Sequence, residues 1–312
     1  MQYQFIRKNS HRFTVEEMCE CFSLSRSGYY DWKERGPSKR ESEDTTHKAR
    51  IAELHHRARG RYGHRPIYHH LLEDGIACGR DRTLRLMKEL GIEGIQKTGF
   101  KPMGTDSSHG LGYSPNLLRD RDWPERCDQV WVSDTTYLKI EAGWCYLATV
   151  MDLFSRRIIG WSISNDNDST LVCQALRGAV LTRGGQLDPG LIHHSDRGST
   201  YAGHEYGRLL GSLRIRQSMS RKGNCYDNAA MESFYGRYKS ASVRGVTFMG
   251  EDQARANAFE YIEIFYNRFR KHGSLEYKNP VEFEENFAPH GGQTTSKPKG
   301  LHKQQLNYNL MR

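Results

Sequence analysis

The chain has 312 residues, a hydrophobic content of 37% and a formal net charge of +9. This length predicts about two domains with buried cores, and the excess of basic residues favours a polyanionic partner such as nucleic acid. The seven cysteines form no paired framework, and no Cys-x-x-Cys motif has partner histidines, which argues against a disulfide scaffold and a structural zinc site. No long apolar run or apolar N-terminal region is present, so the sequence indicates a cytoplasmic protein without a membrane span.

Residues 1–36 have the pattern of a helix-turn-helix segment. Thr14 and Glu17 form a capping-box pair that predicts the start of a short helix, and Ser25 can cap a second helix after a tight turn. The second helix of such a motif usually enters the major groove of DNA. Arg26 and Ser27, at its start, are therefore candidate DNA contacts. An ordinary helical hairpin fits the same pattern.

Residues 45–96 predict a second helical domain, also a candidate for DNA binding. After a polar link over residues 36–44, a helix is expected near residues 46–57. A further helix is expected over residues 80–90, with arginines and a lysine outside its apolar face, namely Arg82, Arg85 and Lys88. A helical packing domain with solvated arginines is the alternative. Residues 97–126, which are rich in Gly, Pro, Ser and charge, predict a linker.

Residues 127–287 predict an α/β domain. Three strands in a meander are expected at residues 130–140, 144–154 and 157–164, followed by alternating helix and strand at residues 168–181, 191–194, 201–210 and 213–217. This order is typical of a ribonuclease H-like fold with a mixed five-stranded sheet. One long helix is expected over residues 252–270. The tail, residues 288–312, has few hydrophobic residues and is expected to be disordered.

Three acidic residues, Asp134, Asp196 and Glu232, stand where metal-binding carboxylates are expected. Asp134 lies within a predicted strand, Asp196 ends a second strand, and Glu232 lies in the first turns of a helix that Asp227 or Asn228 can cap. Two strand-borne aspartates and a helix-borne glutamate can converge at one sheet edge, where their oxygens would suit Mg²⁺ or Mn²⁺. Two such ions could serve phosphoryl transfer. Any single acid, however, is more often a solvated surface charge.

Basic residues surround the third carboxylate. From residue 208 to residue 244 there are eight Lys or Arg residues against two acids, Asp227 and Glu232. This charge is expected to attract backbone phosphates. The loop over residues 220–225 is predicted to supply contacts through Arg221 and Lys222, and we add Arg197 and Asn228 as candidate DNA-binding residues.

Several motifs together resemble one known family. They are the runs over residues 25–30, 61–63, 131–137, 152–161, 194–199 and 226–234, followed by Tyr266-Asn267, His272 and Pro280. In these motifs the chain is similar to the DDE transposases of the insertion sequence three family, second reading frame product, which are relatives of retroviral integrases. The resemblance extends from Arg7 to Phe287. Thr200, Tyr238, Ala241 and Glu276 depart from the usual residues of the family, and none of these departures removes a candidate metal ligand.

The resemblance implies a specific chemistry. It implies that Asp134, Asp196 and Glu232 bind two Mg²⁺ ions, with Mn²⁺ as a substitute, and cut and join the ends of the element. Lys239, two helical turns after Glu232, matches a basic residue that meets terminal DNA, although a solvated lysine is the alternative.

The resemblance also implies the partners. They are double-stranded DNA, as terminal inverted repeats and target, further copies of the chain on that DNA, and an upstream-frame protein or frameshift fusion that carries a leucine zipper, which this sequence lacks. The location expected is the nucleoid of a bacterial cytoplasm.

Three functions remain open at this point. The first is a metal-dependent strand transferase. The second is a sequence-specific DNA-binding regulator without catalysis, which the helix-turn-helix pattern and the basic charge support but which leaves the three acids unexplained. The third is a ribonuclease H-like nuclease that only hydrolyses DNA.

Overall fold

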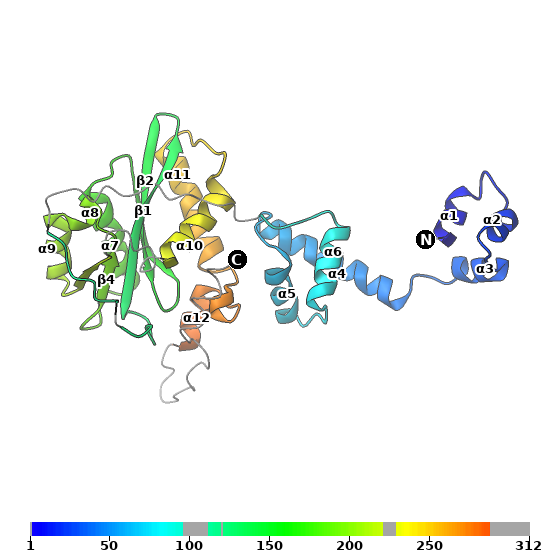
Figure 1. The fold of residues 1–312 in the computed structure, drawn as a ribbon, viewed down its shortest axis with the longest axis horizontal. Coiled ribbons are helices and arrows are strands. Elements are labelled where there is room, and N and C mark those ends of the chain that lie inside the picture. The colour runs from blue at the N-terminus through cyan, green and yellow to red at the C-terminus, as the bar shows by residue number, and fades with distance from the viewer. Residues whose placement is uncertain (1, 96–111, 120, 221–228, 288–312) are drawn as a thin grey trace. The chain divides into compact units, whose positions relative to one another are not determined.

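The computed structural model describes residues 2–95, 112–119, 121–220 and 229–287. The chain divides into two compact units, Met1–Gly94 and Ile95–Arg312, and each is described by itself. The first unit is helical and the second contains a sheet with helices on both faces (Figure 1). Arg221, Lys222, Asn228 and the predicted tail lie outside the described residues.

The first unit begins with three short helices, α1 (Gln2–Asn9), α2 (Val15–Cys21) and α3 (Arg26–Glu34). The predicted capping box is confirmed, since the Thr14 side chain accepts from the Glu17 amide and the Glu17 carboxylate accepts from the Thr14 amide. Ser25 caps α3 as expected by accepting from the amide of Gly28. The helices enclose a small core of their own around Ile6, Met18, Cys19 and Tyr29.

Three further helices follow in this unit, α4 (Lys39–Arg57), α5 (His64–Glu73) and α6 (Arg80–Glu89). The prediction of a polar link up to residue 44 was wrong, because Ser38 and Glu41 form a capping box that starts α4 at Lys39. On α6, Arg82 and Arg85 are not simply solvated. Both pair with Asp44 of α4, at 2.7 and 2.8 Å, and so join the two helices.

The second unit is built on a five-stranded sheet in the order β3-β2-β1-β4-β5. Strands β1 (Val130–Ile140), β2 (Gly143–Asp152) and β3 (Ile158–Ser164) are antiparallel neighbours. Strands β4 (Ile192–Ser195) and β5 (Arg216–Met219) run parallel to β1. The mixed sheet predicted for a ribonuclease H-like fold is confirmed.

Helices cover both faces of this sheet (Figure 1). On one face lie α7 (Ser169–Thr182), α8 (Ser199–Ala202) and α9 (His204–Ser212), packed on a core that includes Trp131 and Leu176. Gly160 of β3 allows α7 to approach, because a Cβ at this position would lie 2.2 Å from the carbonyl oxygen of Ala175. The other face carries α10 (Ala229–Tyr238) and α11 (Glu251–Phe259).

The single long helix expected over residues 252–270 was wrong in form. The α-helix ends at Phe259 and continues as a π-helix, η3 (Glu260–Tyr266), and a second π-helix, η2 (Lys239–Val243), follows α10. After η3 come a 3₁₀ turn, η4 (Gly273–Leu275), and α12 (Pro280–Phe287). Of the helices described, none combines the length and the apolar character that crossing a membrane requires.

An ion-pair cluster connects α12 to the sheet. The guanidinium of Arg183, which follows α7, bonds to the carboxylates of Glu284 at 2.6 Å and Asp128 at 2.8 Å, and Arg157 bonds to Glu284 at 2.6 Å. The four side chains are between 10% and 27% exposed, so solvent screens these pairs less than it screens pairs at the surface. The cluster therefore fixes the C-terminal helix against β2, β3 and α7.

Candidate active site

The sheet register brings Asp134 and Asp196 together. Val132 of β1 lies opposite His194 of β4 in the parallel pair. Asp134 follows Val132 by two residues, and Asp196 follows His194 by two residues. Neighbouring strands are about 4.8 Å apart, and residues two apart point to the same face. Asp134 is half-buried within β1, whereas Asp196 is the first residue after β4. The predicted convergence of these two strand-borne carboxylates is what the register produces.

Glu232 reaches this place from α10, which lies on the same face as Asp134. The helix is anchored one turn further along by Tyr235, whose hydroxyl lies 2.7 Å from the carbonyl oxygen of Asp134 and 3.1 Å from that of Leu147. The hydroxyl of Thr149, the partner of Asp134 in the ladder, is 2.9 Å from the same phenolic oxygen. Residues 232 and 235 lie on one side of an α-helix. The anchor thus holds Glu232 beside the strand that carries Asp134.

The charges of the other two acids act on the carboxyl group of Asp134. Burial raises the pKa of Asp134 to about 8, and the negative charges of Asp196 and Glu232 add to this rise. The amide of Thr135, which donates to the carboxylate at 2.8 Å, and the charge of Lys239 act in the opposite direction. Like charges raise a carboxyl pKa when they are near one another. The charges of Asp196 and Glu232 therefore disfavour ionisation of the Asp134 carboxyl group.

The loop after β4 is held by its own contacts. The Asp196 carboxylate accepts from the amide of Gly198 at 2.9 Å, and Arg197 donates from Nε to the carbonyl oxygen of Ser220 at 2.8 Å. The Arg197 guanidinium also lies over the ring of Tyr113, 4.6 Å from its centroid. Arg197, predicted as a DNA contact, thus has a structural role in fixing the loop beside Asp196.

Lys239 lies near the carboxylates by a different route from the one expected. The prediction placed it on an α-helical face two turns after Glu232, but the α-helix ends at Tyr238 and Lys239 begins the π-helix. Its ammonium nitrogen lies 4.1 Å from the centroid of the Tyr137 ring. Burial lowers the pKa of Lys239, and the charge of Asp134 opposes this. The lysine therefore belongs to the electrostatic surroundings of Asp134.

The two candidate DNA contacts of the helix-turn-helix lie at the start of α3. Arg26 pairs with Glu16 at 2.7 Å, and both side chains are more than half exposed. The hydroxyl of Ser27 lies 2.7 Å from that of Ser25, the helix cap. Exposed pairs of this kind contribute little to stability, so Arg26 can exchange its partner for a phosphate at small cost. Their role in DNA binding remains a prediction.

Two kinds of residue escaped sequence reasoning. Tyr235 looked like one more aromatic residue of a helix, and nothing local indicates that its hydroxyl reaches β1. His193 is fully buried, with Nε2 2.7 Å from the Ser133 hydroxyl and 2.9 Å from the Tyr206 hydroxyl. This network supports the strand that ends at Asp196. A polar pair, His193-His194, inside an apolar strand was the only local signal for it.

Among the described residues, the potential metal ligands whose atoms all lie within 4.8 Å of one another are Cys127, Asp152 and Glu284, whereas the oxygens of the three acids are spread more widely. Arg183 and Arg157 already neutralise Glu284, and burial, followed by the charges of Asp152 and Glu284, raises the pKa of the Cys127 thiol. A protonated thiol is a poor metal ligand. We therefore assign this group to the ion-pair cluster that fixes α12.

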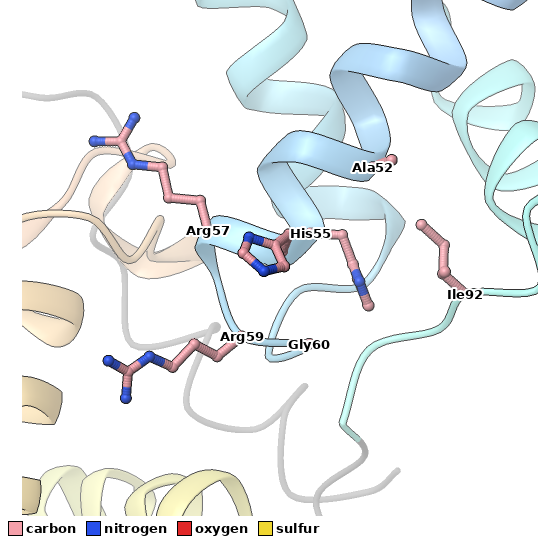
Figure 2. Close-up of a pocket in the computed structure, with 7 residues that line it drawn as sticks. Ala52, His55, Arg57, Arg59, Gly60 and Ile92 are labelled. Atoms are coloured by element: carbon pink, nitrogen blue, oxygen red, sulfur yellow. The ribbon is translucent and has the colours of Figure 1, made fainter.

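The first unit contains a pocket at the end of α4. It is lined by Ala52, His55, His56, Arg57, Arg59, Gly60 and Ile92. Figure 2 shows the arginine side chains directed away from Ile92, and none of the lining residues is a carboxylate. The pocket offers histidine and arginine side chains but no carboxylate. It therefore adds nothing to the chemistry of the three acids.

Family models match the chain in three places. A model of an integrase core domain matches residues 124–225, a second integrase core model matches residues 213–280, and a model of an HTH-like domain matches residues 41–100. Among solved structures, the catalytic core domain of HTLV-2 integrase in complex with magnesium aligns with a TM-score of 0.38 at 16% identity, over 51% of this chain and 97% of that chain.

Two curated relatives match along nearly their whole length. The uncharacterized 31 kDa protein of insertion element IS600 from Shigella sonnei is 43% identical, over 86% of this chain and 98% of its own. Transposase InsF for insertion sequence IS3A from Escherichia coli K12 is 34% identical, over 91% of this chain and 98% of its own. With an HTH-like region, an integrase core and this similarity over most of its length, the chain belongs to the IS3-family transposases.

Proposed function

We propose that this transposase cleaves and joins DNA at the ends of an insertion sequence, and that Asp134, Asp196 and Glu232 are its catalytic carboxylates. The observation that carries the proposal is the sheet register, which sets Asp134 and Asp196 on neighbouring strand paths, with α10 anchored to the Asp134 backbone through Tyr235. Burial and the charges of the other two acids also raise the pKa of Asp134, and perturbed carboxyl groups cluster at functional sites.

The donor set fits two divalent cations. Carboxylate oxygens are the ligands that Mg²⁺ and Mn²⁺ prefer, and the site offers them from two strands and one helix. When bound, a pair of Mg²⁺ ions would supply Lewis-acid activation of the attacking oxygen and stabilisation of the leaving oxygen. The side chains of this chain do the rest, because their positions decide where the scissile phosphate must lie.

Each residue has a separate task in this scheme. Asp134 and Asp196 form the rigid part of the site, since the backbone ladder sets their separation. Tyr235 is a positioning residue that keeps Glu232 within reach of them. Lys239 adds a positive charge beside Asp134, where a terminal phosphate of the element would approach.

The proposed reaction consists of two displacements at phosphorus. In the first, water attacks the phosphodiester at the end of the element, its P–O3′ bond breaks, and the element keeps a free 3′-hydroxyl. In the second, that hydroxyl attacks a phosphodiester of the target, a new P–O bond forms, and the target's own 3′-oxygen leaves. No external energy source is needed, because one phosphodiester replaces another.

The test uses a labelled DNA duplex from the end of the element. Incubation of the full chain with this duplex, a target plasmid and Mg²⁺ should give joined products. Asp134→Asn and Glu232→Gln should abolish both cleavage and joining while end binding persists, because the amides keep the shape and lose the charge. Asp166→Asn, a change at an exposed acid after β3, is the matched control and should leave both steps unchanged. Joining by either site variant would sink the assignment.

The alternatives give different products in the same assay. A regulator without catalysis would bind the duplex and never nick it at any Mg²⁺ concentration. A nuclease that only hydrolyses would give nicks without joined molecules. Replacement of Mg²⁺ by Mn²⁺ should support joining, and chelation should stop both steps while leaving binding in place.

The same proposal includes the partners of the reaction. The helix-turn-helix segment and the HTH-like domain would bind the inverted repeats, with Arg26 and Ser27 facing the DNA, and two or more copies of the chain would hold two ends together. A product of the upstream frame, or a fusion with it, would help in finding the ends. Size measurement of the chain on end duplexes, with and without that product, tests both points.

A further inference from the structure

Three arginines gather on the far side of α10 from different parts of the second unit. Arg156 belongs to the turn between β2 and β3, Arg237 to the last turn of α10, and Arg270 to the segment after η3. The charges of all three act on His272, whose ring contacts that of Tyr266 with the centroids 4.7 Å apart at an interplanar angle of 88°. The three arginines are spread over more than a hundred residues of the sequence, and the fold brings them together.

The contacts that position these arginines are to neutral groups. Arg270 donates from Nη1 to Nε2 of His272 at 2.7 Å, and its guanidinium carbon is 5.8 Å from the Tyr266 ring centroid. Arg156 stacks over Trp123 at 4.8 Å. Among the described residues no carboxylate forms a salt bridge with any of the three arginines, although Asp152 lies near Arg156. Asp152 is itself occupied by Arg183 and by backbone amides of Asp128 and Ser155.

The crowding of positive charge affects every titratable group in the cluster. Burial, and then Arg270, Arg237 and Arg156 in turn, lower the pKa of His272 well below its ordinary value. Partial burial, followed by Arg270, lowers the pKa of Arg237. His272 therefore stays neutral and accepts the hydrogen bond that orients Arg270. Like charges disfavour one another, so an anion bound among the three arginines would be stabilised.

We infer that Arg156, Arg237 and Arg270 form a binding site for a backbone phosphate of the DNA on which the enzyme acts. Arginine suits this task because its planar fork donates two parallel hydrogen bonds to phosphate oxygens. The inference rests on the proposed function for its choice of ligand, since α10 carries both Glu232 and Arg237. The two positions are five residues apart, or about 7.5 Å along the helix axis at 1.5 Å per residue. The two positions also lie about 140° apart around the helix, so the site and the carboxylates would contact different stretches of the DNA backbone.

The arrangement also explains why the site is rigid. His272 holds Arg270, Trp123 holds Arg156, and Arg237 alone is exposed at the surface. The two held arginines lose little conformational entropy on binding, because their side chains are already oriented. The exposed arginine can close on the phosphate from the solvent side. The site would therefore fix a stretch of DNA backbone on the other side of α10 from the carboxylates, without reading its sequence.

Binding of a short end duplex by the full chain tests this inference without any catalysis. Affinity is measured by fluorescence anisotropy over a range of salt concentrations, with Ca²⁺ in place of Mg²⁺. Arg237→Gln and Arg270→Gln should each weaken binding about 10- to 100-fold, the usual effect of removing hydrogen bonds to a charged group. The slope of log K against log salt should fall by about one for each variant. Arg268→Gln, a change at an exposed arginine of the same segment, is the matched control and should alter neither quantity.

Two further measurements keep the outcome clear. Arg237→Lys should retain the salt slope and lose part of the affinity, because the charge remains and the fork is lost. Inorganic phosphate, added at constant ionic strength, should compete with DNA only at millimolar concentrations. The inference is overturned if folded Arg237→Gln and Arg270→Gln proteins bind like the wild type, or if phosphate binds at micromolar concentrations and DNA does not displace it. Failure of the wild type to join DNA would count against the proposed function alone, since these experiments measure binding.

Discussion

The hydroxyl of Tyr235 is the most informative single atom to remove. This hydroxyl ties α10, and with it Glu232, to the strand of Asp134 through a 2.7 Å hydrogen bond to the Asp134 carbonyl oxygen. Tyr235→Phe deletes this bond and the contacts to Leu147 and Thr149 while keeping the ring. Buried polar atoms left without a partner cost about 1–3 kcal/mol. We expect the free energy of unfolding to fall by about 1–2 kcal/mol, measured by urea denaturation.

The same helix offers a matched control. Tyr238 is also fully buried, and its hydroxyl donates to Oδ1 of Asn257 at 3.0 Å, toward α11 rather than toward β1. Tyr238→Phe should lose a similar amount of stability. Only Tyr235→Phe should raise the Mg²⁺ concentration for half-maximal strand transfer and lower the rate of joining, by about 10- to 100-fold, as changes in groups that support metal ligands usually do.

The assay is single-turnover joining of a labelled end duplex at several Mg²⁺ concentrations, with both variants at a temperature where each is folded. A purely structural role for Tyr235 would shift its melting temperature and leave the Mg²⁺ dependence unchanged. Equal Mg²⁺ dependence of the two variants would therefore refute the view that α10 is positioned through this bond.

Three other outcomes follow from the structure. Arg183→Ala removes the cation that pairs with Asp152 and one of the two that pair with Glu284, and it should cost about 3–5 kcal/mol of unfolding free energy in urea. Arg126→Ala, which removes a more exposed pair with Asp188, should cost less than about 1 kcal/mol. Equal losses would contradict the assignment of a buried cluster. Burial, and then His194, lower the pKa of His193 to about 3, so below about pH 6.5 the native state binds fewer protons than the unfolded chain and the free energy of unfolding should fall as the pH falls. His193→Gln should flatten this slope by about 1.4 kcal/mol per pH unit, and an unchanged slope would contradict the buried neutral histidine. Because the pKa of Asp134 is raised to about 8, the metal-free native state keeps a proton that the unfolded chain loses near pH 4, so the free energy of unfolding should decrease as the pH rises from 4 to 8. For the same reason the Mg²⁺ affinity measured by calorimetry should increase about tenfold per pH unit from pH 6 to 8. An affinity that does not change with pH would exclude competition between Mg²⁺ and a proton at Asp134.

Much of the sheet could be predicted because its strands are rich in β-branched and aromatic residues. The run over residues 130–140 has seven such residues among eleven, and β1 occupies those residues. The place of Asp196 followed in the same way, since apolar residues lead to it and Arg197-Gly198-Ser199 end the strand. The parity that turns both aspartates to one face could not be read from the sequence, because it depends on pairing Val132 with His194 across sixty-one intervening residues.

The helical parts could be predicted less well, for a physical reason. Nothing within residues 252–270 breaks a helix locally, as no glycine or proline occurs there. The change to a π-helix at Glu260 places Tyr261, Ile262, Phe265 and Tyr266 in the core together, so tertiary packing decides it. The helix start at Lys39 was accessible, because Ser38 and Glu41 form a capping box as plain as that of Thr14 and Glu17. The ion pairs of Glu284 with Arg157 and Arg183 could not be foreseen, because their partners lie over a hundred residues apart.

One aromatic layer links the two places where this enzyme is proposed to meet DNA. Phe234 of α10, two residues after Glu232, contacts the Tyr266 ring at 4.8 Å, and Tyr238 contacts Tyr261 at the same distance. The Tyr266 ring also contacts the ring of His272, which accepts a hydrogen bond from Arg270. Because a packed aromatic layer resists small shifts, α10 and the arginine cluster must move together or not at all. The separation between the third carboxylate and the proposed phosphate site is thus set by the protein core, whereas that between the two aspartates is set by the sheet.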